Sequence, residues 1–142
     1  METIKNRAVG VLIIRLILGL IFLMQGFGKV FTIGVENVYN GFFKVTFHGY
    51  LPEAITYATA YYTSYIELLG GLLLIIGLKR DLSLYFLGSV LIIVSFGHGL
   101  VEPIWELDHV MYRLILLSAL LLLPKTWDIY SLDNLRSKGK KN

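Results

Sequence analysis

Four apolar runs, separated by short polar segments, divide the chain. Each run approaches the length of about 20 residues that a helix needs to cross the hydrocarbon core of a bilayer. The pattern predicts an all-α fold, a four-helix transmembrane bundle with spans at about 8–30, 58–78, 82–101 and 104–123. We expect residues 1–142 to form a single integral membrane domain.

The start of the fourth span has two candidate signals. Pro103 is a favourable first residue of a helix, whereas Asp108 is a favourable N-cap. The early start gives a helix of roughly 31 Å and the late start one of roughly 22 Å, at about 1.5 Å per residue. Pro103 also disfavours helical geometry at Glu102, so the third span is expected to end there.

The connection between the first two spans, residues 31–58, mixes polar and aromatic residues. Val and Phe alternate with Asn, Gly and Lys over residues 35–47, a pattern that predicts a short helix lying at the membrane interface. A turn is expected at 49–52, where Gly and Pro occur. The alternative is an ordered cap with no site of its own.

Composition and charge favour a membrane protein over a soluble one. The chain is 56% hydrophobic and only 16% charged. Most of its Lys and Arg residues gather near the two ends and in the turn at 79–81. This topology signal predicts a multi-pass protein of the cytoplasmic membrane whose N-terminus and basic tail, 125–142, lie on the cytoplasmic side. The expected partner is therefore membrane lipid, and nucleic acid is excluded. Because the chain has no Cys, thiolate nucleophiles and Cys-ligated metals are excluded as well.

Polar residues interrupt the apolar runs, where they are costly and tend to face the interior of a bundle. One face of the first span carries Arg15, Gly19, Phe22, Gly26 and Lys29, with Gln25 beside it. Glu67 lies near the middle of the second span. We expect Glu67 to pair with Arg113 or Arg15, and Lys29 to pair with Glu102 or Glu106.

Residues 98–113 hold a further group of ionisable side chains. A helix that starts at Glu102 would place four of them on one face, at spacings of four, three and four: Glu102, Glu106, His109 and Arg113. With His98 they predict a small polar cavity toward the outer face. The candidate ligand-binding residues are Arg15, Gln25, Lys29, Glu67, His98, Glu102, Glu106, His109 and Arg113. The alternative is that the buried charges only fix which helices are neighbours.

Metal ions, haem and quinones are the candidate ligands of this cavity. Di-iron bundles use the Glu106-x-x-His109 spacing, but they need two such motifs and the chain has one. A mononuclear metal site with His98, Glu106 and His109 stays an alternative, and haem is a weaker one. A quinone or similar ring compound fits better, since it enters from lipid and needs an apolar slot with a proton carrier such as His98 or His109. No catalytic residue is assigned.

Several short motifs, taken in order, resemble the DoxX family. They are Arg15-Leu16-x-x-Gly19-x-x-Phe22, Gln25-Gly26-x-Gly28-Lys29, Gly41-Phe42-Phe43, Glu67-Leu68-Leu69-Gly70-Gly71 and Tyr130-Ser131-Leu132-Asp133. Gln25 stands where many members have a His. The resemblance implies a four-helix membrane protein, similar to the membrane subunit of a thiosulfate:quinone oxidoreductase. It also implies that Arg15, Lys29, Glu67 and His98 are the matching polar positions.

These observations lead to two hypotheses of function. The first is a small membrane subunit linked to redox chemistry at a quinone-type ligand, with the electron-transfer cofactor on a partner redox subunit because no cofactor motif occurs in this chain. Such a protein could also form a homo-oligomer. The second is a non-catalytic membrane assembly factor or scaffold, whose buried charges are structural.

Overall fold

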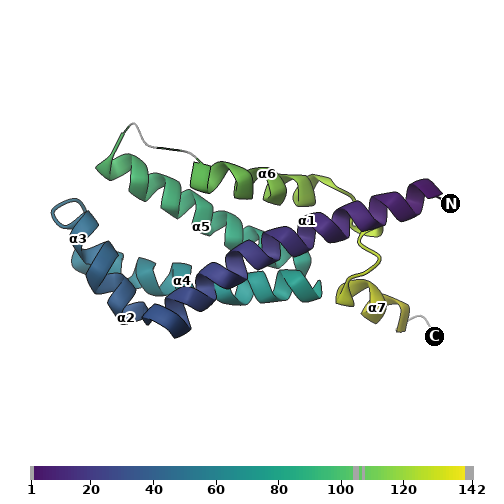
Figure 1. Ribbon diagram of the computed structural model, residues 1–142, viewed down its shortest axis with the longest axis horizontal. Helices are drawn as coiled ribbons and strands as arrows, with labels where there is room; N and C mark the ends of the chain where they lie inside the picture. The colour runs from purple at the N-terminus through teal and green to yellow at the C-terminus, as the bar shows by residue number, and fades with distance from the viewer. Residues whose placement is uncertain (1, 104–105, 107, 140–142) are drawn as a thin grey trace.

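The computed structural model describes residues 2–103, 106 and 108–139, and this part of the chain forms helices and turns without a strand. Its long helices are α1 (Glu2–Phe27), α4 (Glu53–Ile76), α5 (Arg80–Val101) and α6 (Asp108–Leu122) (Figure 1). The π-helical segment η1 (Gly28–Ile33) extends α1, and three short segments follow it: α2 (Val35–Val38), η2 (Tyr39–Phe43) and α3 (Lys44–Phe47). After α6 come η3 (Lys125–Trp127) and α7 (Leu132–Gly139). The predicted all-α fold class is confirmed.

Three helical stretches among the described residues are long and apolar enough to cross a membrane: Thr3–Ile33, Glu53–Ile76 and Arg80–Val101. They identify a membrane protein in contact with lipid. Helix α6 has 15 residues, or about 22 Å at about 1.5 Å per residue, which matches the later of its two predicted starts. The earlier start falls partly outside the described residues. A fourth crossing therefore stays a prediction.

Two predicted boundaries are corrected. Helix α4 begins at Glu53, directly after Pro52, and not at residue 58, so its first turns include residues that sequence reasoning assigned to the connection. Glu102 is extended, with φ −135°, and Glu106 lies outside a helix. The predicted helical face that starts at Glu102 is therefore wrong, because only His109 and Arg113 of its four members lie on α6.

Both termini lie at one end of the long helices, together with the turn between α4 and α5 (Figure 1). We call this the termini end. The short segments α2 and α3 lie at the opposite end, near the last turns of α5. The short helix predicted within residues 35–47 is thus confirmed as helical structure, here in three pieces. Two termini at one end agree with an even number of crossings, while their cytoplasmic location stays a prediction.

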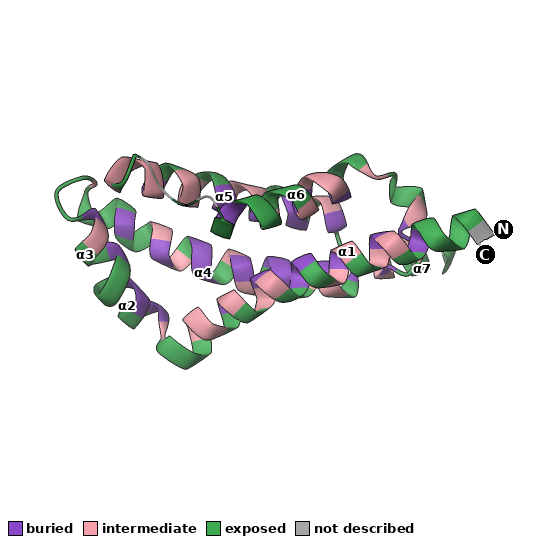
Figure 2. Cartoon of the chain, turned by 45° about the horizontal axis from the view of Figure 1, so that its top comes forward, coloured by how far each residue is buried: buried purple, intermediate pink, exposed green. Residues whose placement is uncertain are grey.

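Helices α1 and α4 pack along the face that sequence analysis singled out on the first span. Arg15, Gly19, Phe22 and Gly26 are buried there, and Figure 2 shows the buried positions along α1 and α4. A Cβ atom at Gly26 would clash with the backbone of Leu68. These glycines let the two backbones approach closely, as small residues do between helices in lipid. The remaining apolar core joins leucines of α4, α5 and α6 to this face.

We expect Gly71→Ala to destabilise the bundle, because a Cβ there would meet the backbone of Leu23 and lie 2.8 Å from the Gly19 carbonyl oxygen. Overpacking of this kind costs about 1–3 kcal/mol. Gly10→Ala is the matched control, since no atom lies within 4 Å of its added Cβ. Thermal unfolding in mild detergent, followed by circular dichroism, should give a lower melting temperature for Gly71→Ala than for Gly10→Ala. Equal melting temperatures would contradict the close approach.

Candidate functional site

The central polar feature of the bundle is an ion pair between α4 and the π-helical segment η1. The ammonium Nζ of Lys29 lies 2.7 Å from Oε2 of Glu67. The Glu67 side chain is 2% exposed and that of Lys29 is 26% exposed. Because Gly26 lies against the backbone of Glu67 and Leu68, Lys29, three residues further along the same face, reaches the carboxylate. π-Helical turns are rare and often occur at functional sites.

Two more of the predicted residues lie near this pair. The guanidinium of Arg113, from α6, interacts electrostatically with Glu67, and its Cζ lies 5.8 Å from the centre of the Phe22 ring. No ion pair within 4.0 Å of Arg113 is found among the described residues. The side-chain oxygen of Gln25 is buried and has no hydrogen-bond partner in the described part of the chain. The predicted neighbourhood of Glu67 and Arg113 is thus present, but Lys29 is the direct partner of Glu67.

Arg15 belongs to a different site, at the termini end. Its Nη1 donates to the carbonyl oxygens of Leu74 (2.7 Å) and Ile75 (2.6 Å), at the end of α4. Its Nε lies 3.2 Å from the carboxylate of Asp128, which follows η3 and is 3% exposed. The predicted pair of Arg15 with Glu67 is therefore wrong, because the α1–α4 packing places Arg15 against the last turn of α4.

Asp128 also lies 3.6 Å from Nη1 of a second buried arginine, Arg80. Nη2 of Arg80 donates to the carbonyl oxygens of Leu120 and Leu123, at the end of α6. Two buried guanidinium groups thus cap two helices and share one carboxylate. Sequence reasoning treated Asp128 as part of a polar tail, and the available signal was its place two residues before the motif Tyr130-Ser131-Leu132-Asp133.

The residues predicted at the outer corner do not gather into a metal site. Glu102, Glu106 and His109 are exposed, and His98 is half-buried. In residues 2–103, 106 and 108–139, no three His, Cys, Asp or Glu side chains lie close enough together to hold a metal ion. The predicted pair of Lys29 with Glu102 or Glu106 is wrong as well, since Lys29 is paired with Glu67. The grouping of His98, Glu106 and His109 around a metal therefore receives no support.

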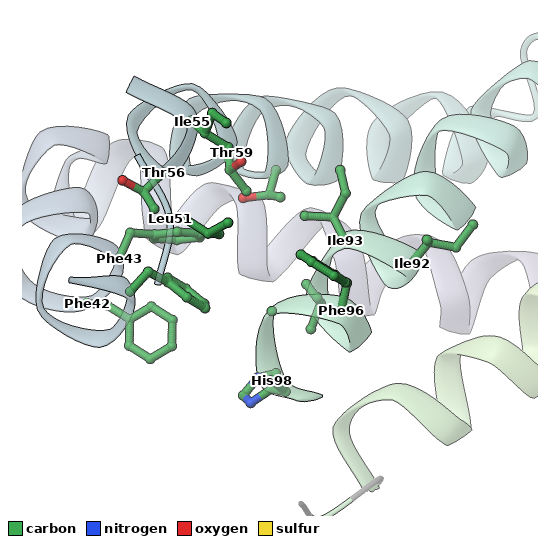
Figure 3. A pocket seen from close by; sticks show the side chains of 14 residues that line it. Phe42, Phe43, Leu51, Ile55, Thr56, Thr59, Ile92, Ile93, Phe96 and His98 are labelled. Atoms are coloured by element: carbon green, nitrogen blue, oxygen red, sulfur yellow. The ribbon is translucent and has the colours of Figure 1, made fainter. Parts of the chain in front are cut away.

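His98 instead lines an apolar cavity of about 390 Å³ at the end of the bundle where α2 and α3 lie. Figure 3 shows side chains of α4 and of residues 42–51 along one side of this cavity and side chains of α5 along the other. His98 lies at one edge. The lining residues are Phe42, Phe43, Phe47, Leu51, Ile55, Thr56, Thr59, Thr63, Ile92, Ile93, Val94, Phe96, Gly97 and His98. Aromatic rings, aliphatic side chains and a few hydroxyls thus enclose a space suited to a small apolar ring.

Sequence reasoning missed most of these residues. The available signal was a polar stripe on α4, in which Thr56, Thr59, Thr63 and Glu67 follow at spacings of three, four and four and therefore share one face. The first three line the cavity. Thr63 is one helical turn from Glu67, or about 6 Å along the axis at about 1.5 Å per residue. The inner end of the cavity thus lies close to the ion pair.

Glu53 joins the short segments η2 and α3 to the start of α4. Its Oε1 lies 2.8 Å from Nζ of Lys44 and accepts a hydrogen bond of 2.9 Å from the hydroxyl of Tyr39. The hydrogen bond to Glu53, with its charge, raises the pKa of Lys44 above its ordinary value. Lys44 directly follows Phe42 and Phe43, so these contacts hold the phenylalanine wall of the cavity over α4.

One comparison with known proteins finds a family for this chain. The model of the DoxX family matches residues 10–100, more than half of the chain. That stretch includes Lys29, Glu67 and all the residues that line the cavity, His98 among them. Searches of curated proteins and of solved structures found no match.

Proposed function

Because the chain belongs to the DoxX family, whose members are membrane proteins, we propose that it binds a lipophilic ring compound of the quinone class in the aromatic cavity and serves redox chemistry in the cytoplasmic membrane. The observation that carries this proposal is the cavity itself. Its volume of about 390 Å³ lies within the range of roughly 300–1,000 Å³ typical of small-molecule sites. Its walls are mostly aromatic and aliphatic, as a flat apolar ring requires.

The polar groups of the cavity match the carbonyl groups of such a ring. His98 at the edge supplies an imidazole, a ring that can donate a hydrogen bond to a carbonyl oxygen. Thr59 on α4 brings a hydroxyl group to the same space, while the Thr63 hydroxyl donates to the carbonyl oxygen of Ala60 in its own helix. A bound quinone would supply the electron-accepting ring, while this chain binds and orients it. Electrons would come from a partner redox subunit.

The Lys29–Glu67 pair supports the same proposal from the inner side. It sets two opposite charges about one helical turn beyond Thr63, in a segment where ionisable groups are expensive and most often functional. Arg113 adds a second positive charge from α6. We propose Lys29, Glu67, Arg113 and Gln25 as the polar inner boundary of the site. Arg15 has a separate, structural role in the same proposal.

The test is mass spectrometry of lipophilic compounds on protein purified in mild detergent, followed by equilibrium titration with a short-chain benzoquinone. We expect about one quinone per chain and at least tenfold weaker binding by His98→Ala, with a melting temperature within a few degrees of the parent protein. His109→Ala is the matched control, since His109 is exposed on α6 and does not line the cavity. Its affinity should not change.

A protein that stays empty after incubation with quinones would overturn the proposal. It would favour the assembly-factor hypothesis, which has its own support in the structure. The buried charges at the termini end are paired with each other and with helix carbonyls, as expected of groups that only hold helices together.

A further inference from the structure

A second hollow lies against the cavity on the lipid-facing side of α4. It has a volume of about 500 Å³ and is lined by Ala54, Ile55, Ala58, Thr59, Tyr62 and Ile93. Three of these residues, Ile55, Thr59 and Ile93, also line the aromatic cavity, and Figure 3 shows them on neighbouring parts of α4 and α5. The two spaces therefore share a wall of three side chains. We call the second one the α4 groove.

Small side chains and exposed apolar ones shape the α4 groove. Ala54 and Ala58 are one turn apart on α4, and both are exposed. Ile55 is 51% exposed, so the groove opens to the surroundings of the bundle, which are lipid in a membrane. At its inner end the hydroxyls of Tyr62 and Ser89 lie 2.7 Å apart and join α4 to α5. The α4 groove is thus an open, mostly apolar hollow on the surface of α4 and α5.

We infer that the cavity is entered sideways from the membrane through the α4 groove, and that its ligand is an amphiphile with one long apolar tail that lies in this groove. This inference rests on the proposed function and specifies its ligand. The argument is continuity: a ring in the cavity contacts Ile55, Thr59 and Ile93, and a tail attached to that ring continues past the same three residues without leaving an apolar environment. A tail directed into water would be costly, because every CH₂ group would expose apolar surface to water.

The inference separates two kinds of ligand. A tail-less ring needs only the cavity, so bulk in the groove does not affect its binding. A tailed ring cannot occupy the cavity when the groove is filled, because its tail must leave the cavity past Ile55 and Thr59 and this exit is then blocked. Tail packing itself adds little affinity, because lipid is as apolar as the groove. The sharpest readout is therefore exclusion of the tailed compound.

The experiment uses Ala58→Phe, which fills the groove, and two probes, a tail-less methylated benzoquinone and the same ring with a ten-carbon chain. Affinities are measured in mild detergent at equal mole fraction in the micelle. We expect Ala58→Phe to weaken binding of the tailed probe at least tenfold and that of the tail-less probe less than twofold. Leu69→Phe is the control, since Leu69 is exposed on the same helix and lines neither space. It should change neither affinity.

Equal affinities of the parent protein and Ala58→Phe for the tailed probe would overturn the inference that the tail lies in the α4 groove. The proposal that the cavity binds a quinone would remain intact. If neither ring binds the parent protein, the proposed function fails. Photo-cross-linking with a fatty alcohol that carries an aliphatic diazirine then tests separately whether an apolar tail binds in the α4 groove. Cross-links within residues 54–62 that disappear in Ala58→Phe would support a tail site. Cross-links spread evenly over exposed helix positions would overturn it.

Discussion

Asp128→Asn is expected to cause one of the two largest losses of stability among single substitutions in this chain. The Asp128 carboxylate is the shared counterion of two buried guanidinium groups, 3.2 Å from Nε of Arg15 and 3.6 Å from Nη1 of Arg80. All three side chains are less than 5% exposed. Removing one partner of a buried ion pair costs about 3–5 kcal/mol, because the remaining charge stays desolvated. Here the remaining charges are two.

The loss should extend to helix ends. Arg15 caps the last turn of α4 through Leu74 and Ile75, and Arg80 caps α6 through Leu120 and Leu123. Without Asp128, mutual repulsion acts on both guanidinium groups while they bind these carbonyls. The buried charges at the termini end would therefore loosen three segments together: the end of α4, the end of α6 and the segment after η3.

Unfolding in mixed micelles, by titration with sodium dodecyl sulfate, measures this effect. Glu53→Gln is the matched control, because the Glu53 carboxylate pairs with Lys44 and the two side chains are 67% and 49% exposed. An exposed pair of this kind contributes little to stability. Equal unfolding midpoints for Asp128→Asn and Glu53→Gln would show that Arg15 and Arg80 do not need the Asp128 carboxylate.

The sequence predicted the parts of the fold that depend on local pattern. Apolar length located the helices, Pro103 marked the end of α5 at Glu102, and the spacing of Arg15, Gly19 and Gly26 identified the face of α1 that packs on α4. Each of these signals lies within one element or at one boundary. The start of α4 was placed too late, since Tyr57 and its neighbours weakened the apolar signal although the backbone there is helical.

Partner choice could not be predicted in the same way. Lys29 and Glu67 are 38 residues apart, and their contact depends on where Gly26 lets α1 rest on α4. The cavity posed a similar difficulty, because its phenylalanines come from a connection with no periodic pattern. They reach α4 and α5 only through the chain path of α2, η2 and α3. Tertiary register, which one sequence does not contain, decides both features.

The second large effect concerns the Lys29–Glu67 pair, where we expect the two single substitutions to differ. Lys29→Met leaves the Glu67 carboxylate, 2% exposed, without its direct partner, and should cost about 3–5 kcal/mol. Glu67→Gln leaves the ammonium of Lys29, which is 26% exposed and has a flexible stem that can carry the charge toward the interface. Its cost should be smaller. Titration with sodium dodecyl sulfate in mixed micelles gives both values.

The double variant Lys29→Met with Glu67→Gln separates structure from function. It removes both charges, so it should be more stable than Lys29→Met alone, a coupling that a double-mutant cycle measures directly. Equal costs for the two single substitutions would instead indicate that Arg113 replaces Lys29 as the counterion of Glu67, and Arg113→Met in the Lys29→Met background would then add a further loss. If the double variant is as stable as the parent protein but does not bind quinone, the pair belongs to the ligand site. If the double variant has both the stability and the quinone affinity of the parent protein, the pair only holds η1 against α4. That result would favour the assembly-factor hypothesis over the ligand site.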